Sequence, residues 1–196
     1  TQLVKDSDVP GWCLVDWNLH LNKQASAQGI YLYCILAAKK IAGILGQTQL
    51  EAHLERDYLA KRAAAELLWD AKRGVYVSGT KKQVSWASQV WMVLGGAAHG
   101  NAALLERLEG SGAEQMVTPY MYHNYVDALF ALGQNEKALR VLEKYWGGML
   151  DQGADTFWEL YNPQNPEESP YGGTVVNSYC HAWSCAPAYF LRKFGK

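Results

Sequence analysis

Apolar side chains recur at steps of three and four residues along most of the chain, which is the spacing of one face of an α-helix. The first stripe stops at Gly46, and glycine readily takes the left-handed conformation that ends a helix. This spacing predicts a helix whose stripe is Ile30, Tyr33, Cys34, Ala37, Ile41 and Leu45.

Further stripes follow, several of them with recognisable ends. Thr118 and Pro119 provide a capping residue and a first-turn proline, and Gly133 closes that segment. The segments with helical spacing or helix-forming composition are 47–68, 86–97, 101–109, 118–133, 135–146 and a last helix that carries Tyr179, Trp183, Pro187 and Phe190.

Strand signals are weak, and the best one is the short segment 74–78. Short connections between successive helical segments favour antiparallel helix pairs, as in a bundle or an α/α toroid. One connection is long: residues 162–173 are rich in proline and glycine. Long loops in compact domains are often functional, so this loop is a candidate part of a site.

Composition narrows the class of protein. Apolar residues make up 49% of the chain and charged residues 19%, which predicts a folded domain. The formal net charge of −1 gives no basic field that would bind nucleic acid or anionic lipid, and apolar stretches are interrupted well before membrane-spanning length. Aromatic residues reach 12%, with eight tryptophans, which is typical of a large helical core or of a carbohydrate site.

Four cysteines, Cys13, Cys34, Cys180 and Cys185, show neither C-x-x-C spacing nor a zinc pattern with histidine. We interpret them as buried thiols of a reducing compartment, which predicts a cytoplasmic protein; the alternative is that they form disulfides. The chain begins at Thr1 without a signal peptide or an initiator methionine, which favours a cut chain or part of a longer polypeptide.

Two segments on either side of the long loop carry candidate chemistry. Glu159 follows Trp158, and a carboxylate beside bulky rings loses solvation, which suits it to proton transfer; the alternative is an exposed loop acid. A Trp–Glu pair also fits sugar binding, with the ring stacking and the acid bonding to hydroxyls. His181 is either a satisfied core histidine or a functional one. Asp16, between Trp12 and Trp17, is either functional or part of a half-buried loop.

Several short blocks then resemble one family in sequence, order and spacing. The most specific are residues 153–159 (GADTFWE) and 180–187 (CHAWSCAP). The others are 15–17, 118–122, 128–130, 138–139 and 145–149. Together they resemble the bacterial α-L-rhamnosidases, glycoside hydrolase family 78, over most of the chain.

The resemblance implies an all-α fold, an (α/α)6 toroid, and inverting hydrolysis of terminal α-L-rhamnosides without a cofactor or metal. Glu159 matches the general base that activates water, His181 a histidine that contacts rhamnose, and Trp17 a wall of the sugar pocket. Asp16 and Trp158 are expected to take part in substrate binding beside them. The family's general acid belongs to an upstream acidic motif that this sequence does not contain.

We therefore expect residues 1–196 to form the C-terminal half to two-thirds of the toroid, completed by an N-terminal portion of the same enzyme. The expected ligand is a rhamnose-containing glycoside, and self-association into a homo-oligomer is possible. Two alternatives remain open: another α/α-toroid glycan enzyme, such as an unsaturated glucuronyl hydrolase, and a non-catalytic helical interaction module. A direct test of the site is whether Glu159, His181 and Trp17 converge in space.

Overall fold

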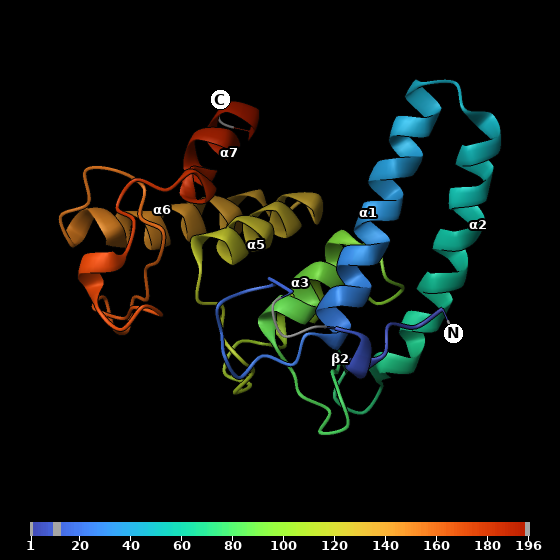
Figure 1. Cartoon of the computed structure of the whole chain (residues 1–196), viewed down its shortest axis with the longest axis horizontal. Coiled ribbons are helices and arrows are strands. Elements are labelled where there is room, and N and C mark those ends of the chain that lie inside the picture. Colours follow the sequence, from blue (N-terminus) through green and yellow to red (C-terminus); the bar gives the residue numbers. More distant parts are fainter. Residues whose placement is uncertain (1, 10–12, 195–196) are drawn as a thin grey trace. The chain divides into compact units, whose positions relative to one another are not determined.

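The computed structural model of the chain describes residues 2–9 and 13–194 and divides into two compact units. The first comprises Thr1–Val15 and His20–Gln115, and the second comprises Asp16–Leu19 and Met116–Lys196. Figure 1 shows that helices dominate, which confirms the all-helical prediction. Among the described residues, no helix is both long enough and apolar enough to cross a membrane.

The first unit is built on a helical hairpin. Helices α1 (Gln24–Ile44) and α2 (Thr48–Ala65) pack side by side and are joined by a short turn at Gly46, whose φ is +65° (Figure 1). The predicted stop at Gly46 is therefore confirmed. Beyond α2, Glu66–Leu68 form a 3-10 turn, so the predicted helical segment ends in a tighter last turn.

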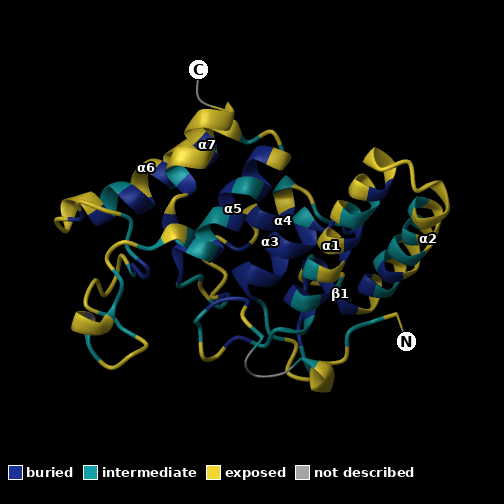
Figure 2. Cartoon of the chain, turned by 45° about the horizontal axis from the view of Figure 1, so that its top comes forward, coloured by how far each residue is buried: buried dark blue, intermediate teal, exposed yellow. Residues whose placement is uncertain are grey.

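Helix α3 (Trp86–Leu94) packs against α1 and is buried along almost its whole length; Figure 2 shows it in dark blue. Ser85 caps it by accepting the N–H of Ser88. The two helices approach closely at Gly29, where an added Cβ would lie 2.6 Å from the carbonyl carbon of Trp91. A glycine at this point of α1 is what permits the contact.

The apolar stripe that predicts α1 is not the face that this helix buries. Its buried apolar residues include Ala25, Leu32 and Ile35, whereas Ile41 is 58% exposed. Because α1 is apolar around most of its circumference, spacing alone does not decide which face packs. The face with the small residues packs against α3, since only that face allows the backbones to approach.

The strand content is minor. Strands β1 (Trp69–Asp70) and β2 (Val75–Tyr76) form one antiparallel pair, with Trp69 opposite Tyr76 and Asp70 opposite Val75. This position agrees with the weak strand signal at 74–78. A short helix, α4 (Ala102–Glu106), is capped by the side chain of Asn101 and completes the helices of this unit.

The second unit contains a second pair of packed helices, α5 (Pro119–Ala131) and α6 (Asn135–Asp151), separated by a turn at Gly133 with φ +72°. Thr118 caps α5 by accepting the N–H of Met121, as its position before a proline predicted. Helix α7 (Ala186–Phe194) packs its buried Phe190 against Phe130 of α5, with the ring centroids 5.4 Å apart.

The predicted last helix is wrong in its start. Tyr179 and Trp183 precede α7, in a segment with 3-10 turns at Thr174–Val176 and Ala182–Ser184. Proline fits the first turn of a helix but not its interior, where it removes a hydrogen bond and clashes with the preceding turn. Pro187 is the second residue of α7, so the helix begins at Ala186 rather than before Tyr179.

The interpretation of the cysteines as buried thiols is also wrong. Cys34, Cys180 and Cys185 are exposed in this chain and Cys13 is partly buried, and all four are free thiols. Cys34 lies on the exposed face of α1, opposite to the packing of that helix on α3, and Cys180 and Cys185 flank the turn that precedes α7.

Candidate active site

Two backbone segments of the second unit run alongside each other and bring Glu159 next to His181. The N–H of Glu159 donates to the carbonyl of Ser178 at 2.9 Å, and the N–H of His181 donates to the carbonyl of Phe157 at 2.7 Å. These two bonds fix the residues from which both side chains project. The long loop 162–173 lies between these segments in the sequence.

The carboxylate of Glu159 is buried and held by hydrogen bonds. The residue is 7% exposed, which excludes the alternative of an exposed loop acid. Its Oε2 accepts the backbone N–H of Ser178 at 2.8 Å, and its Oε1 accepts the hydroxyl of Tyr171 at 2.8 Å. The Nε2 of His181 lies 3.8 Å from Oε1, which is ion-pair distance whenever the ring is protonated.

His181 is half-buried, and its two ring nitrogens face different groups. Nδ1 accepts the backbone N–H of Trp183 at 3.4 Å. In the neutral ring this bond places the proton on Nε2, the nitrogen that faces Glu159. The histidine is thus a donor beside a carboxylate rather than a fully enclosed core residue.

A wall of aromatic rings lies next to these two side chains. The rings of Trp17 and Trp183 meet edge to face with centroids 4.9 Å apart, and Trp183 also contacts His181 at 4.6 Å. The indole N–H of Trp183 donates to the carbonyl of Glu159 at 2.8 Å. Tyr171 packs edge-on against Trp17 at 5.5 Å. Glu159, His181 and Trp17 therefore converge around Trp183, as the sequence predicted.

Asp16 is buried at 4% exposure, and protein donors engage its carboxylate. Oδ1 accepts the N–H of Trp17 at 2.9 Å and both the N–H and the hydroxyl of Thr118 at 3.0 and 2.7 Å, while Oδ2 accepts the N–H of Val117 at 2.8 Å. Burial raises the pKa of Asp16, and the bond from the Thr118 hydroxyl is the largest of the opposing contributions. The side chain ties Trp17 to the start of α5.

Trp158 lies in a different group of rings from Trp17 and Trp183. It contacts Tyr179 at 5.3 Å and Tyr161 at 6.3 Å. The Glu159 carboxylate has different partners, the Tyr171 hydroxyl and the Ser178 N–H, although the two residues are adjacent in the sequence. The structure does not bring Trp158 into the Trp17–Trp183 wall.

Two residues of the site were not singled out from the sequence. Trp183 lies within the 180–187 block, but the pattern alone gave it no role. Tyr171 lies in the loop 162–173, which was recognised as a candidate site segment, yet nothing in the sequence identified which of its residues meets Glu159. Its reach to that carboxylate depends on the folded path of the loop.

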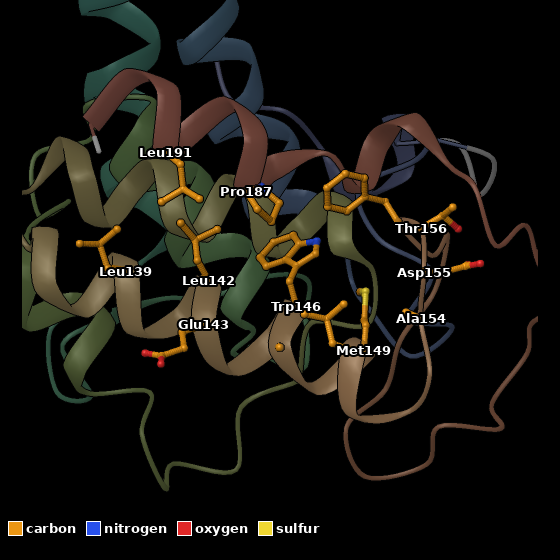
Figure 3. A pocket seen from close by; sticks show the side chains of 13 residues that line it. Leu139, Leu142, Glu143, Trp146, Met149, Ala154, Asp155, Thr156, Pro187 and Leu191 are labelled. Carbon is orange, nitrogen blue, oxygen red and sulfur yellow. The ribbon is translucent and has the colours of Figure 1, made fainter. Parts of the chain in front are cut away.

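An apolar cavity of about 630 Å³ lies between α6, α7 and residues 154–157. Figure 3 shows Leu139, Leu142 and Trp146 of α6 directed toward Pro187 and Leu191 of α7. Its lining contains Phe157 but neither Glu159 nor His181, so this cavity is distinct from the carboxylate site. It is lined by Leu139, Leu142, Glu143, Trp146, Gly147, Met149, Leu150, Ala154, Asp155, Thr156, Phe157, Pro187 and Leu191.

Within residues 2–9 and 13–194, no three histidine, cysteine, aspartate or glutamate side chains gather closely enough to hold a metal ion. The site brings together a buried carboxylate, an adjacent imidazole and aromatic rings. This combination suits proton transfer to or from a group that stacks on rings and carries hydroxyls.

Comparisons with known proteins agree with this reading. Residues 3–194 match the family model described as the bacterial α-L-rhamnosidase six-hairpin glycosidase domain. A rhamnosidase from Klebsiella oxytoca with rhamnose bound is 43% identical with a TM-score of 0.89; the alignment covers 94% of this chain and 37% of that one. A family 78 rhamnosidase of Bacillus sp. GL1 is 25% identical with a TM-score of 0.76, over 92% of this chain and 20% of that one.

The chain thus spans only about a third of the Klebsiella enzyme and a fifth of the Bacillus enzyme. A comparison with curated proteins finds no match. The family match covers almost the whole chain, and the helical hairpins of this chain agree with a domain that is built of hairpins. The chain belongs to the bacterial α-L-rhamnosidase six-hairpin glycosidase family.

Proposed function

We propose that this chain forms part of an enzyme that hydrolyses terminal α-L-rhamnosides with inversion, and that Glu159 is its general base. The observation that carries the proposal is the buried Glu159 carboxylate beside His181 and the Trp17–Trp183 wall. Family membership and the similarity to a rhamnosidase with bound rhamnose point to the sugar.

In this mechanism Glu159 removes a proton from a water molecule, and the water oxygen bonds to the anomeric carbon from the face opposite the leaving group. The glycosidic C–O bond breaks, and the departing oxygen takes a proton from a general acid. The backbone N–H of Ser178 fixes Oε2 of Glu159, so the bond to water falls to Oε1.

The neighbouring side chains bind and orient the sugar. His181 donates its Nε2–H to a sugar hydroxyl, and the indoles of Trp17 and Trp183, whose planes meet at 66°, form an apolar corner against which the sugar's C–H groups pack. Asp16 contributes by holding Trp17 in place, because its carboxylate is already engaged by protein donors. Trp158 supports the site through its contacts with Tyr179 and Tyr161.

We place the general acid in a part of the enzyme outside these 196 residues, because the acidic motif that the resemblance implies does not occur in the sequence. In inverting glycosidases the two carboxyl groups lie about 6.5–9.5 Å apart, which leaves room for the water. The reaction needs no cofactor. The remainder of the enzyme would also cover the exposed apolar face of α1, a face that otherwise favours self-association.

The test uses the complete enzyme that contains this sequence, with p-nitrophenyl α-L-rhamnoside as substrate. We expect Glu159→Gln to lower kcat by about 10²–10⁴-fold while L-rhamnose still binds, since a positioned base contributes about that much. Glu136→Gln, at a side chain that is 91% exposed, is the matched control and should keep full activity.

Proton NMR of the first product identifies the stereochemistry: inversion yields β-L-rhamnose before mutarotation. Initial release of the α-anomer would refute inversion, and an active Glu159→Gln enzyme would refute the assignment of the base. The isolated 196-residue chain is expected to bind rhamnose but to turn over the substrate poorly. Turnover equal to that of the complete enzyme would show that an acid lies within the chain.

A further inference from the structure

The one oxygen of Glu159 that the mechanism leaves for water is covered by Tyr171. The Tyr171 hydroxyl donates to Oε1 at 2.8 Å, and the Glu159 side chain is only 9% exposed. Tyr171 itself is 50% exposed, so it lies at the outer edge of the site. A half-exposed phenol therefore stands between this carboxylate oxygen and solvent.

The loop that carries Tyr171 is anchored close to that residue. The hydroxyl of Ser169 donates to Oδ1 of Asn177 at 2.7 Å and accepts the N–H of Tyr171 at 3.2 Å. The backbone at Tyr171 is thereby tied down, while its side chain is held by the bond to Glu159 and by the edge contact with Trp17. The backbone anchors and the side-chain contacts are thus separate, so breaking the side-chain contacts does not require the backbone anchors to break.

The two oxygens of Glu159 differ in how easily their partners can leave. Oε2 bonds the N–H of Ser178, whose backbone also pairs with Glu159, so this bond cannot open without disturbing the chain. Oε1 bonds a side-chain hydroxyl on an exposed loop. Oε1 is also the oxygen that faces His181 Nε2, so a ligand that bonds both groups must reach this position.

We propose, on the basis of the function proposed above, that Tyr171 is a gate: its hydroxyl occupies Oε1 of Glu159 in the free protein, and a sugar hydroxyl or water must displace it. The hydrogen bond to Glu159 raises the pKa of Tyr171, so the phenol stays a neutral donor at ordinary pH. If the site is open in only a fraction of the molecules, the apparent affinity for a ligand equals the affinity of the open site multiplied by that fraction.

The first experiment measures access to Glu159 without any sugar. The 196-residue chain is treated with a carbodiimide and glycine ethyl ester, and labelling of Glu159 relative to exposed Glu136 is followed by mass spectrometry. We expect Tyr171→Phe to raise relative labelling by about three- to tenfold, because it removes a hydrogen bond to a charged group at a half-exposed position. Tyr171→Ala should raise it at least as much. Unchanged labelling in both variants would overturn the gate.

The second experiment measures L-rhamnose affinity by tryptophan fluorescence or calorimetry. The gate predicts that Tyr171→Phe binds rhamnose about three- to tenfold more tightly than the wild-type chain. The control is Tyr189→Phe, because Tyr189 is similarly exposed and its hydroxyl accepts a hydrogen bond from the charged Lys193 at 2.9 Å. Rhamnose affinity should change in this variant only if the loss of any exposed tyrosine hydroxyl changes it. Weaker or unchanged binding in Tyr171→Phe would show that the phenol holds the sugar or takes no part, and would overturn the proposal.

The two experiments separate failure of the gate from failure of the proposed function. If the wild-type chain and every variant fail to bind rhamnose, the assignment of the sugar site to this chain is refuted, and the labelling result alone decides whether Tyr171 closes the carboxylate. If rhamnose binds and labelling does not change, the gate is wrong while the sugar site stands.

Discussion

Replacing Asp16 tests whether one buried carboxylate holds Trp17 in the site. Asp16→Ala removes the acceptor for the N–H groups of Trp17, Val117 and Thr118 and for the Thr118 hydroxyl. Asp16→Asn is the milder change, because its one remaining oxygen can replace Oδ1 and keep the three bonds made there. The amide nitrogen then faces the N–H of Val117, which loses its acceptor.

The magnitude follows from the number of bonds and the cost of the charge. A buried donor left without a partner costs about 1–3 kcal/mol, so the bonds alone would suggest a very large loss for Asp16→Ala. Burial of the carboxylate opposes this, since it raises the pKa of Asp16 despite four donated bonds. We therefore expect Asp16→Ala to lower the free energy of unfolding by about 2–4 kcal/mol, and Asp16→Asn by about 1–2 kcal/mol.

The raised pKa also fixes how the difference depends on pH. In the folded chain Asp16 holds its proton to a higher pH than its ordinary pKa of 3.8 allows, so between 3.8 and the folded-state pKa the folded state binds more protons than the unfolded state. Wild-type stability therefore falls as pH rises from about 3.8 through the folded pKa, and Asp16→Asn lacks this contribution. The destabilisation caused by Asp16→Asn should shrink as pH rises through that interval.

Urea unfolding of the 196-residue chain, followed by circular dichroism and tryptophan fluorescence at several pH values, measures both effects. Asp155→Ala, at an exposed aspartate of the same unit, is the control and should stay within about 0.5 kcal/mol of the wild type. A loss below that level for Asp16→Ala, or a destabilisation by Asp16→Asn that grows with pH, would refute the role of Asp16 as a buried anchor.

Two further predictions concern packing and pH. Gly29→Ala should lower the free energy of unfolding by about 1–3 kcal/mol, because its Cβ would meet the Trp91 backbone at 2.6 Å. Gly147→Ala in helix α6, where the added Cβ meets open space, should raise the free energy of unfolding by about 0.5–1 kcal/mol. Thermal unfolding of both variants measures the difference, and equal effects would refute the close approach of α1 and α3. Burial lowers the pKa of His123, so wild-type stability should fall as pH drops below about 6.5, and His123→Phe should remove that fall in acid unfolding curves; an unchanged slope would contradict it.

Helix positions followed from the sequence wherever a local signal marked an end. Thr118 before a proline, Gly46 and Gly133 act through the geometry of one or two turns, so no distant contact is needed to recognise them. The packed face of α1 did not follow, because the helix offers apolar residues in several directions and the choice depends on α3. The same limit applied to Cys34, whose exposure depends on which face of α1 packs.

The same distinction between local sequence signals and contacts made only in the folded chain applies to the candidate site. Glu159 and His181 were identified because their sequence blocks are specific, and local backbone pairing brings those blocks together. Tyr171 could not be identified, since its contact with Glu159 depends on the folded path of a loop with no periodic pattern. Trp158 shows the converse: its neighbour in sequence is the candidate base, yet its ring contacts Tyr161 and Tyr179 rather than the Trp17–Trp183 wall.

Thr118 links the start of a helix to the candidate sugar site. Its hydroxyl accepts the N–H of Met121 at 3.2 Å, which caps α5, and donates to Oδ1 of Asp16 at 2.7 Å. A hydroxyl has one proton and two lone pairs, so both bonds form at once. Because Asp16 in turn binds the N–H of Trp17 at 2.9 Å, the position of the aromatic wall depends on the residue that fixes where α5 begins. The Thr-Pro pattern that predicts this helix is therefore also a requirement of the site, and changes to the cap should disturb Trp17 as well as the helix.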